Sequence, residues 1–387
     1  MKIIEVLNKN EIKKFHEIPY LIYKNDKNWI PHIKQEIESV FDPKKNKFFD
    51  HGIVARFILF NSNKLIGRIA VFIDKKRSNT FEIPTGGIGF FECIEDESAA
   101  FKLFDTAKKW LEERKIKAMD GPINFGEKDR YWGLLINGFD HPPLYGHNYN
   151  PDYYKSFFIK YGFKTYFKQH TFIRPLVYEL PKRFHKRFER IDQNKRYSLK
   201  KIDLKYIVKF AEDFRKVYNS AWVTHDNFKE MSSKQSISLL KKIKPVMDKD
   251  LIWFAYYDND PIGFVIMLPE LNQYFKVTNG NFNIWGKIKF FIKKILTKPK
   301  FVWGLAFGIT PKFQGIGMES YILWTASQQI INHNKHYKEC IISWIGDFNP
   351  KMIHITKSMG GKEYHEHLTL RKIFDNKIKF KRSPIIE

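Results

Sequence analysis

The chain has 387 residues, a length that suits two domains of about 190 residues better than one. Hydrophobic residues make up 43% of the sequence and aromatic residues 17%, which permits a large core and excludes a globally disordered chain. The 67 Lys and Arg residues outnumber the 42 Asp and Glu residues and give a net charge of +25, which indicates either a polyanionic partner or an AT-rich genome.

The cysteines and the apolar runs favour a soluble protein of a reducing compartment, which we expect to be the cytoplasm. Cys93 and Cys340 are the only cysteines and lie far apart in the sequence, which excludes a disulfide scaffold and a zinc ribbon. Residues 1–10 contain too short an apolar run for a signal peptide. The longest apolar stretch, residues 301–309, is too short to span a bilayer.

Two hairpin patterns are the first sign of an internal duplication. Residues 57–67 have the pattern of a strand, a polar turn and a second strand that begins with Ile-Gly. Residues 253–263 repeat this pattern without a gap, 196 residues later.

Two later segments strengthen this interpretation. Asn150-Pro151 and Asn349-Pro350 each precede a helix-length segment that ends at a glycine, and a strand-like run follows each glycine, at 163–173 and 362–373. Because two patterns recur in the same order at nearly the same offset, the sequence predicts a tandem duplication.

Each half is then expected to contain a helical start, a hairpin, a further strand, a long helix, a strand, a helix and a closing strand pair, which makes the chain an α/β protein. The long helix is predicted at 100–114 in the first half and at 317–331 in the second. The basic segment 175–201, which contains two prolines, is expected to connect the halves, and residues 377–387 are expected to form a loose tail.

A glycine-containing turn carries the sharpest chemical signal. The apolar strand 301–309 ends in Thr-Pro, and Lys312, Gln314, Gly315 and Gly317 follow immediately before a predicted helix. Glycines let the backbone approach a ligand closely, and free amides at the start of a helix bind anions. This pattern favours a pyrophosphate site over an ordinary strand-to-helix turn.

The strand, this turn and the later Asn349-Pro350 resemble the GNAT acyltransferases, whose pyrophosphate loop follows the pattern Q/R-x-x-G-x-G/A. Gln314 and Gly317 match that loop, and Glu319 stands where Gly or Ala is usual. Further segments resemble a bacterial family with two GNAT-like halves, the YghO-like proteins, some of which are associated with the acylation of sphingoid bases. These segments are Trp29–Pro31, Phe41–Pro43, Gly89–Glu92, Gly121–Asn124, Gly138–Phe139, Tyr149–Pro151 and Tyr218–Trp222.

The resemblance implies two tandem GNAT-like domains, at 1–175 and 176–376, each a mixed, mostly antiparallel sheet flanked by helices. It also implies acetyl-CoA or a longer acyl-CoA as donor, bound by the second domain. The pyrophosphate would lie at Gln314–Gly317, the pantetheine beside the strand backbone at Phe307 and Ile309, and an adenosine phosphate near Lys312. Asn349 would contact the cofactor arm, and it is also suited to cap the following helix. The first half has acidic residues, 95–97, where a phosphate cradle would be, so we expect it to shape the acceptor site.

The catalytic residues are less clear than the cofactor site. Many GNAT enzymes use a tyrosine four residues before the closing glycine as the acid, and Thr356 occupies that position in the second half. Glu92, at the end of an apolar strand, is our first candidate for the general base, because burial would raise its pKa, although it is equally suited to cap a helix. Asp129 is the second candidate for the base, and Tyr149 is a candidate acid.

Two other patterns carry alternatives. His365 and His367 have a spacing that a metal would accept, but no further ligand is evident, so we expect half-exposed strand histidines and no metal. An amphipathic helix is predicted at 284–298, inside an insertion at 268–300 that has no counterpart in the first half. It would either cover a core or lie in a membrane interface.

Together these patterns predict an acyl-CoA-dependent N-acyltransferase that acts on an amine, with a preference for a long acyl chain or a lipid acceptor. A small-amine N-acetyltransferase, an aminoacyl-tRNA-dependent transferase and a non-catalytic lipid- or anion-binding protein are the alternatives. The expected partners are the acyl-CoA, the amine and an anionic membrane surface at the inner face of the membrane, and no nucleic acid is expected.

Overall fold

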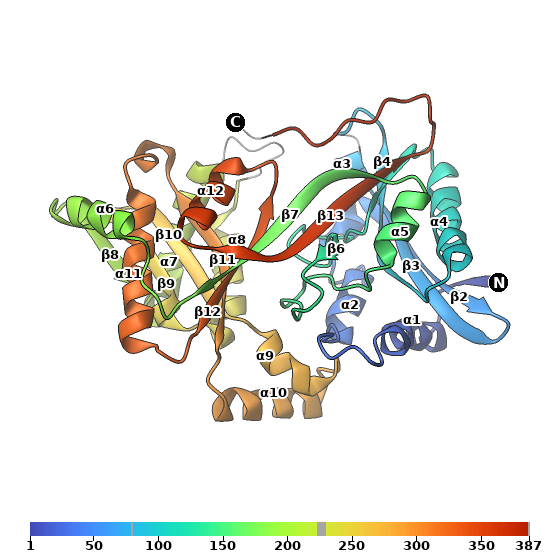
Figure 1. Cartoon of the computed structure of the whole chain (residues 1–387), viewed down its shortest axis with the longest axis horizontal. Coiled ribbons are helices and arrows are strands. Elements are labelled where there is room, and N and C mark those ends of the chain that lie inside the picture. Colours follow the sequence, from blue (N-terminus) through green and yellow to red (C-terminus); the bar gives the residue numbers. More distant parts are fainter. Residues whose placement is uncertain (79, 223–229, 386–387) are drawn as a thin grey trace.

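The computed structural model describes residues 1–78, 80–222 and 230–385 and shows helices packed on a long twisted sheet (Figure 1). The strands are β1 (Lys2–Glu5), β2 (Gly52–Asn61), β3 (Lys64–Asp74), β4 (Thr85–Cys93), β5 (Ala118–Gly121), β6 (Leu134–Asn137), β7 (Lys164–Pro175), β8 (Tyr197–Lys201), β9 (Ile252–Tyr257), β10 (Asp260–Pro269), β11 (Phe301–Ile309), β12 (Glu339–Gly346) and β13 (Lys362–Ile373). The helices are α1 (Lys9–Ile22), α2 (Lys34–Val40), α3 (Lys75–Ser78), α4 (Glu97–Glu112), α5 (Tyr154–Lys160), α6 (Lys182–Asp192), α7 (Ile207–Trp222), α8 (Ser233–Ile243), α9 (Asn272–Phe275), α10 (Ile284–Leu296), α11 (Met318–His333) and α12 (Pro350–Ser358).

In the described part of the chain, the strands form one sheet in the order β1-β2-β3-β4-β5-β13-β7-β12-β11-β10-β9-β8, and β6 pairs with β13 beside this path. Most neighbours are antiparallel, whereas β4 with β5 and β11 with β12 are parallel. This confirms the expected mixed, mostly antiparallel α/β architecture. Both predicted hairpins are present, as β2–β3 and β9–β10.

The two halves exchange their last strands at the centre of the sheet. β7, from the first half, pairs with β12 of the second half, and β13 pairs with β5 of the first half. β7 and β13 also pair with each other and cross the middle of the molecule (Figure 1). The expected ranges 1–175 and 176–376 therefore share a sheet, and their division into two domains remains a prediction.

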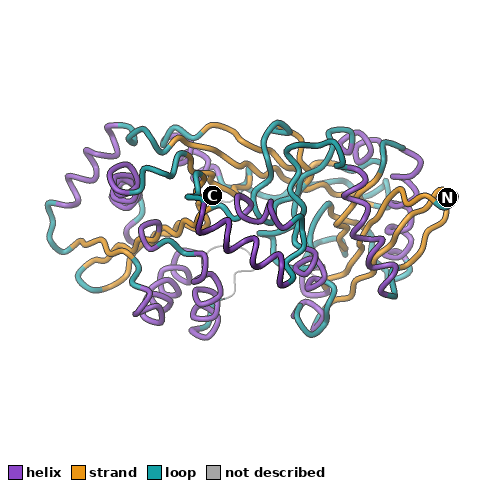
Figure 2. Tube along the Cα trace, turned by 90° about the horizontal axis from the view of Figure 1, so that it is seen from below, coloured by secondary structure: helices purple, strands orange, loops and turns teal. Residues whose placement is uncertain are grey.

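Helices cover both faces of the second half of the sheet, which forms the middle layer (Figure 2). Trp253 and Ala255 face α11, whereas Phe254 and Tyr256 face α7 and α8. This alternation follows from the two-residue period of a strand and explains why β9 is apolar along its whole length. In the first half, α4 packs its apolar side against β3 and its neighbours.

The segment at 175–201, which we expected to connect the halves, contains regular structure. α6 occupies residues 182–192, and β8 forms an edge of the sheet beside β9. Phe184 and Ile191 are buried on the inner side of α6 while its lysines and arginines remain outside, because the helical period separates the two kinds of residue. The described part of the tail, which we expected to be loose, is bonded to β7, since the Ser383 amide donates to the Tyr166 carbonyl.

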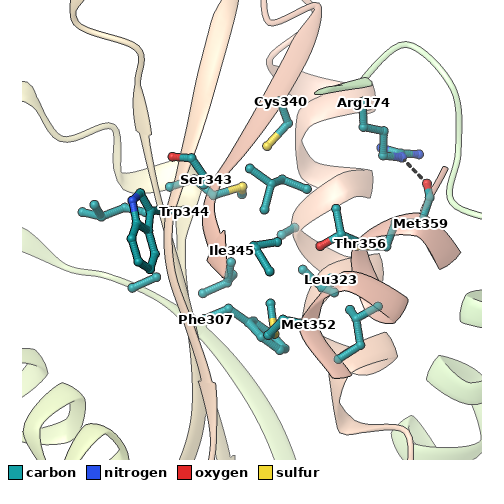
Figure 3. A pocket seen from close by; sticks show the side chains of 18 of the residues that line it. Arg174, Phe307, Leu323, Cys340, Ser343, Trp344, Ile345, Met352, Thr356 and Met359 are labelled. Atoms are coloured by element: carbon teal, nitrogen blue, oxygen red, sulfur yellow. Dashed lines mark hydrogen bonds between the residues drawn. The ribbon is translucent and has the colours of Figure 1, made fainter. Parts of the chain in front are cut away.

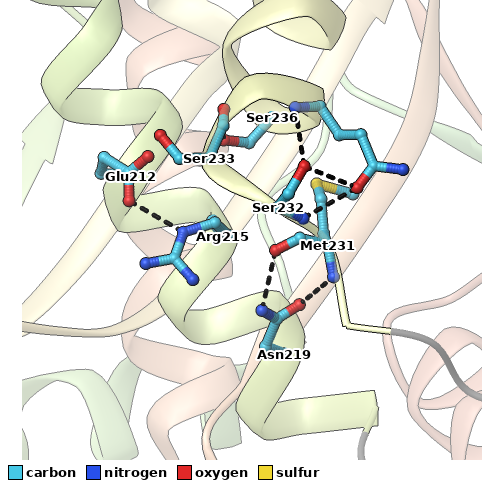
Figure 4. Close-up of polar contacts among 8 residues, drawn as sticks. Glu212, Arg215, Asn219, Met231, Ser232, Ser233 and Ser236 are labelled. Atoms are coloured by element: carbon cyan, nitrogen blue, oxygen red, sulfur yellow. Dashed lines mark hydrogen bonds and ion pairs between the residues drawn. The ribbon is translucent and has the colours of Figure 1, made fainter.

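The connection between α7 and α8 is braced on either side of residues 223–229 (Figure 4). Asn219 donates to the Met231 carbonyl at 3.0 Å and accepts from the Met231 amide at 2.8 Å, and Ser232 caps α8. These contacts fix the end of α7 that carries Tyr218. Residues 223–229 and the side chain of Trp222, the last residue of one family-like segment, lie outside the described part. No helix among the described residues has the length and apolar character needed to cross a membrane.

Candidate active site

The parallel strands β11 and β12 separate part-way along their length. Residues Phe301–Gly304 pair with Glu339–Ile342, and β12 provides no further partner for β11 beyond Gly304. β11 also has one extra residue, Leu305, opposite the step from Ile266 to Met267 in β10, which is a β-bulge. One edge of Leu305–Ile309 is therefore open for hydrogen bonds to a ligand.

A cavity of about 500 Å³ occupies this separation (Figure 3). On one face of the sheet it lies among side chains of α11 and α12, including Leu323, Ile330 and Met352. It also reaches Tyr218 of α7 and Asp129 of the loop after β5, which belong to the opposite face. The cavity thus crosses the sheet between β11 and β12, so two substrates can approach from different faces.

The wall of the cavity is mostly apolar, with a few buried polar atoms that lack a partner. Three residues of this wall carry such an atom, namely Ser327 at Oγ, Trp344 at Nε1 and Thr356 at Oγ1. Thr356 is fully buried, and Figure 3 shows it beside Met352 and Met359. Because a buried polar group without a hydrogen bond costs about 1–3 kcal/mol, a ligand group that reached one of these atoms would gain binding free energy.

The turn between β11 and α11 has a backbone conformation that depends on its glycines. Gly315 and Gly317 have φ values of +75° and +96°, which favour glycine, and Gly317 is the N-cap of α11. The Gln314 side chain donates to the Ile309 carbonyl at 2.9 Å and holds the turn against the end of β11. Across the described residues, the amides of Gly315–Glu319 have no hydrogen-bond acceptor within the protein.

Two arginines of α6 reach this turn, and sequence reasoning missed them. Arg190 donates to the Ile316 carbonyl at 2.6 Å, and Arg187 lies 3.2 Å from the Glu319 carboxylate. The ion pair offsets the negative charge of Glu319 at the position where Gly or Ala is usual. The basic residues of α6 were the available signal, but they were assigned to a connecting segment.

Other predicted cofactor residues lie around the same cavity and turn. Phe307 and Asn349 line the cavity, and Asn349 also caps α12 by accepting from the Met352 amide at 3.2 Å. Ile309 is buried at the end of β11, and Lys312 is exposed in the turn. The structure therefore places all seven predicted cofactor residues on β11, the turn and the start of α12.

Asp129 lies where the cavity reaches the face of α7. Its side chain is exposed to solvent and faces the same space as Tyr218. The nearby Glu127 was not predicted; it is exposed, and partial desolvation together with the charge of Asp129 raises its pKa. A carboxylate at this mouth is suited to accept a proton from a substrate that approaches from this side.

No protein-family model matches the sequence. The structure is similar to the tandem GNAT protein from the clavulanic acid biosynthesis pathway, with a TM-score of 0.53 and 8% identity over 97% of this chain and 98% of that one. It is also similar to a GCN5-related glucosamine N-acetyltransferase region of a fungal multi-domain GH3 beta-N-acetylglucosaminidase, with a TM-score of 0.55 and 13% identity. That match covers 96% of this chain and 38% of the fungal one. The chain has a tandem GNAT fold.

Two curated proteins resemble this tandem GNAT chain over nearly its whole length. Bacterial ceramide synthase of Caulobacter vibrioides (strain NA1000 / CB15N) is 26% identical over 96% of this chain and 97% of the relative. Protein YghO of Escherichia coli (strain K12) is 24% identical over 95% of this chain and 94% of the relative. The expected resemblance to the GNAT superfamily and to these two-half bacterial proteins is thus confirmed.

Glu92 and Tyr149 of the tandem GNAT chain lie away from this cavity. In the sheet, β4, which carries Glu92, is separated from β12 by β5, β13 and β7. Glu92 accepts hydrogen bonds from Tyr23 at 2.8 Å and Tyr154 at 2.9 Å and lies 3.5 Å from Arg68. Burial raises its pKa as expected, whereas the helix cap next to it is Asp96. Tyr149 lines the same small cavity as Glu92 and donates to Asp26 at 2.8 Å.

The opening between β4 and β5 in the first half is filled by the chain itself. The Ile123 amide donates to the Ile88 carbonyl at 2.7 Å, which places Ile123 beside β4 where a ligand would otherwise pair. A Cβ at Gly89 would overlap the Ile123 carbonyl oxygen, so the backbones touch there. In the tandem GNAT fold, the separation between the parallel strands is therefore filled by the chain in the first half and occupied by a cavity in the second half.

The strand histidines are buried, contrary to the expectation of half-exposed positions. His365 and His367 are 2% and 3% exposed, and with His147 they form a group that we call the histidine cluster. Burial lowers the pKa of His147 to about 3, of His365 to about 2 and of His367 to about 4. His147 Nε2 lies 3.3 Å from Ser343 Oγ, which lines the cavity. Among the described residues, no group of three or more His, Cys, Asp or Glu side chains is arranged to hold a metal.

Proposed function

We propose that the protein is an acyl-CoA-dependent N-acyltransferase that transfers a long acyl chain to an amine. The observation that supports this function best is the cavity that crosses the sheet where β11 and β12 separate. It is lined by Phe307 of β11, the strand that leads into a turn with five free amides, and it also reaches Asp129. A donor and an acceptor would therefore meet without sharing an entrance.

The residues present fit a CoA thioester. The amides of Gly315–Glu319, supported by Arg190, would bind the pyrophosphate, and Lys312 would lie near the adenosine phosphates. The open edge of β11 at Phe307 and Ile309 would pair with the pantetheine amides. Asn349 would contact the same arm.

A bound acyl-CoA supplies a thioester carbon, at which a C–N bond to the amine forms and the C–S bond to CoA breaks. We assign to Asp129 the removal of one proton from the attacking ammonium, and the second proton of that nitrogen would pass to the departing sulfur, so that CoA leaves as a thiol. Thr356, in the position of the usual tyrosine acid, would donate a hydrogen bond to the departing sulfur. Glu92 would stabilise the fold of the first half, because its carboxylate is bound to Tyr23, Tyr154 and Arg68.

The long acyl chain is supported by the apolar part of the cavity beyond the point of strand separation. There the cavity continues past Gly304 to Ala326, Ile330, Cys340 and Leu176. The name of the Caulobacter relative, a ceramide synthase, is consistent with amide formation on a long-chain amine. We further propose that 176–376 binds the donor, that 1–175 shapes the acceptor side, and that the protein works in the cytoplasm, which agrees with its two free thiols.

The first test is a thermal-shift titration with CoA, acetyl-CoA and palmitoyl-CoA, followed by an assay of thiol release with a long-chain amine. A ligand that binds the folded state raises the melting temperature according to RT ln(1 + [L]/Kd), so the order of the shifts gives the donor preference. We expect palmitoyl-CoA to stabilise the protein most. Equal shifts would favour small-acyl transfer, and stabilisation by aminoacyl-tRNA alone would refute the proposal.

The second test compares Asp129→Asn with the neighbouring Glu127→Gln. We expect Asp129→Asn to lower kcat about a hundredfold and to leave the Kd of acyl-CoA unchanged, because it removes only a proton acceptor. Glu127→Gln should change kcat less than threefold. Equal losses in both variants would show that the loop has a general electrostatic effect and that Asp129 is not the base.

A further inference from the structure

Helix α10 displays apolar side chains to solvent on one side. It lies at the lower edge of the molecule, away from the sheet (Figure 1). Only Gly286 and Phe290 are buried in this helix. Seven large apolar residues are exposed, and the most exposed are Ile284 at 75%, Trp285 at 72%, Ile295 at 82% and Leu296 at 78%. The others are Ile288, Phe291 and Ile292, which are 42% to 51% exposed.

These seven residues form one continuous face. At 100° per residue they cover an arc of about 140°, and Gly286 and Phe290 fall on the opposite side of the helix. Lys287 and Lys289 lie at the two borders of the apolar arc, and both are exposed. Of the two alternatives for this helix, the one in which the apolar face covers a core does not fit, because that face is exposed and only Gly286 and Phe290, on the other side, are buried.

The helix is held firmly by its other side. Phe290 packs against Tyr274, Phe275 and Phe282 with ring centroids 4.7 to 5.7 Å apart. Asn283 caps the helix, and Lys294 donates to the Pro245 carbonyl at 2.6 Å. No other element of the described chain covers the apolar face. A fixed helix that shows seven large apolar residues to water requires an occupant for that face.

The charge around the helix identifies this occupant. Residues 271–318 contain no Asp or Glu, and seven lysines occur between 271 and 300. We propose that α10 binds the protein to an anionic lipid surface, with its apolar face among the acyl chains and its lysines at the head groups. A second copy of the chain fits less well, because a two-fold contact would place identical lysine borders against each other.

This inference goes beyond the proposed function, since surface binding does not depend on any transfer reaction. It assigns a role to the insertion between β10 and β11. It also brings the chain to the place where long-chain amines and acyl chains are found in a cell.

Vesicle co-sedimentation tests the proposal with the full-length protein. The probes are phosphatidylcholine vesicles and vesicles with about 30% phosphatidylglycerol, at low and physiological salt. The double variant Ile288→Asp/Ile292→Asp changes two exposed positions, and Val208→Asp, at a 48% exposed residue of α7, is the matched control. We expect the wild type and the control to bind anionic vesicles, and the double variant to bind at least tenfold more weakly at an unchanged melting temperature.

Trp285 provides an independent readout. Its fluorescence should shift to shorter wavelength with anionic vesicles, and Trp285→Phe should remove that change while retaining binding. Two outcomes would overturn the proposal: no binding to either kind of vesicle, or binding of the double variant equal to that of the wild type. Self-association of the wild type that Ile288→Asp/Ile292→Asp abolishes, without vesicle binding, would identify a second copy as the occupant.

Discussion

Substitution of Ser327 tests whether the inner cavity holds the acyl chain. Ser327 is 6% exposed on α11, lines the cavity and has an unpartnered hydroxyl. Ser327→Leu adds two carbon-sized groups to the wall and would displace about two methylenes of a bound chain. At about 0.8 kcal/mol per methylene, the cost is about 1.6 kcal/mol, or roughly fifteenfold in Kd.

The assay is a titration of wild type, Ser327→Leu and Ser327→Ala with acetyl-CoA and palmitoyl-CoA. We expect Ser327→Leu to weaken palmitoyl-CoA binding about fifteenfold and acetyl-CoA binding less than twofold. Ser327→Ala removes the hydroxyl without filling the cavity, so it should bind both donors like the wild type and lose no stability. Equal weakening of both donors by Ser327→Leu would show that this part of the cavity holds the pantetheine, and no effect on either would exclude it as a donor site.

Three further predictions concern the anion turn, the sheet and the histidine cluster. Gly317→Asp should abolish CoA binding, because the position requires a positive φ and would gain a negative charge. Calorimetry would measure this loss. Retained affinity would contradict the assignment of the turn to the pyrophosphate. Asp120→Asn should lower the free energy of unfolding by about 3 kcal/mol, because it breaks a buried bidentate pair with Arg371, at 2.6 and 2.8 Å. As a control, Asp152→Asn at an exposed position should change the free energy of unfolding by less than about 0.5 kcal/mol. Each member of the histidine cluster has a folded-state pKa below its unfolded value, so below about pH 6.5 the unfolded chain binds more protons and stability falls. Urea unfolding should show a loss of about 1.5 kcal/mol per histidine between pH 6.5 and pH 5, and a flat profile would contradict their burial as neutral rings.

Local patterns predicted the elements of the sheet well. Hairpins β2–β3 and β9–β10 follow from apolar runs around a polar turn, and the start of α12 follows from Asn349-Pro350. The helix predicted at 100–114 is α4, which begins three residues earlier, at Glu97. The turn at Gln314–Gly317 also has a local signal, because positive φ values and free amides depend on adjacent residues. Such features are encoded within about ten residues.

Features that depend on distant residues were not predictable in this way. Glu92 has the local setting of a buried base, but its partners Tyr23 and Tyr154 come from other elements and bind its carboxylate. His365 was expected at the surface because a strand pattern does not show which face another loop will cover. Arg187 was missed because its contact with Glu319 spans 132 residues.

The exchange of β7 and β13 also has a consequence for how the molecule is made. Its topology is that of a strand-swapped dimer whose two subunits have been joined end to end. The first half leaves the ribosome without the strand that borders β5, and this strand is among the last to be synthesised. Until then β5 has an unpaired edge, at which the incomplete chain can pair with strands of other molecules. A fragment that ends near residue 175 should therefore aggregate, and a separately added second half should rescue it.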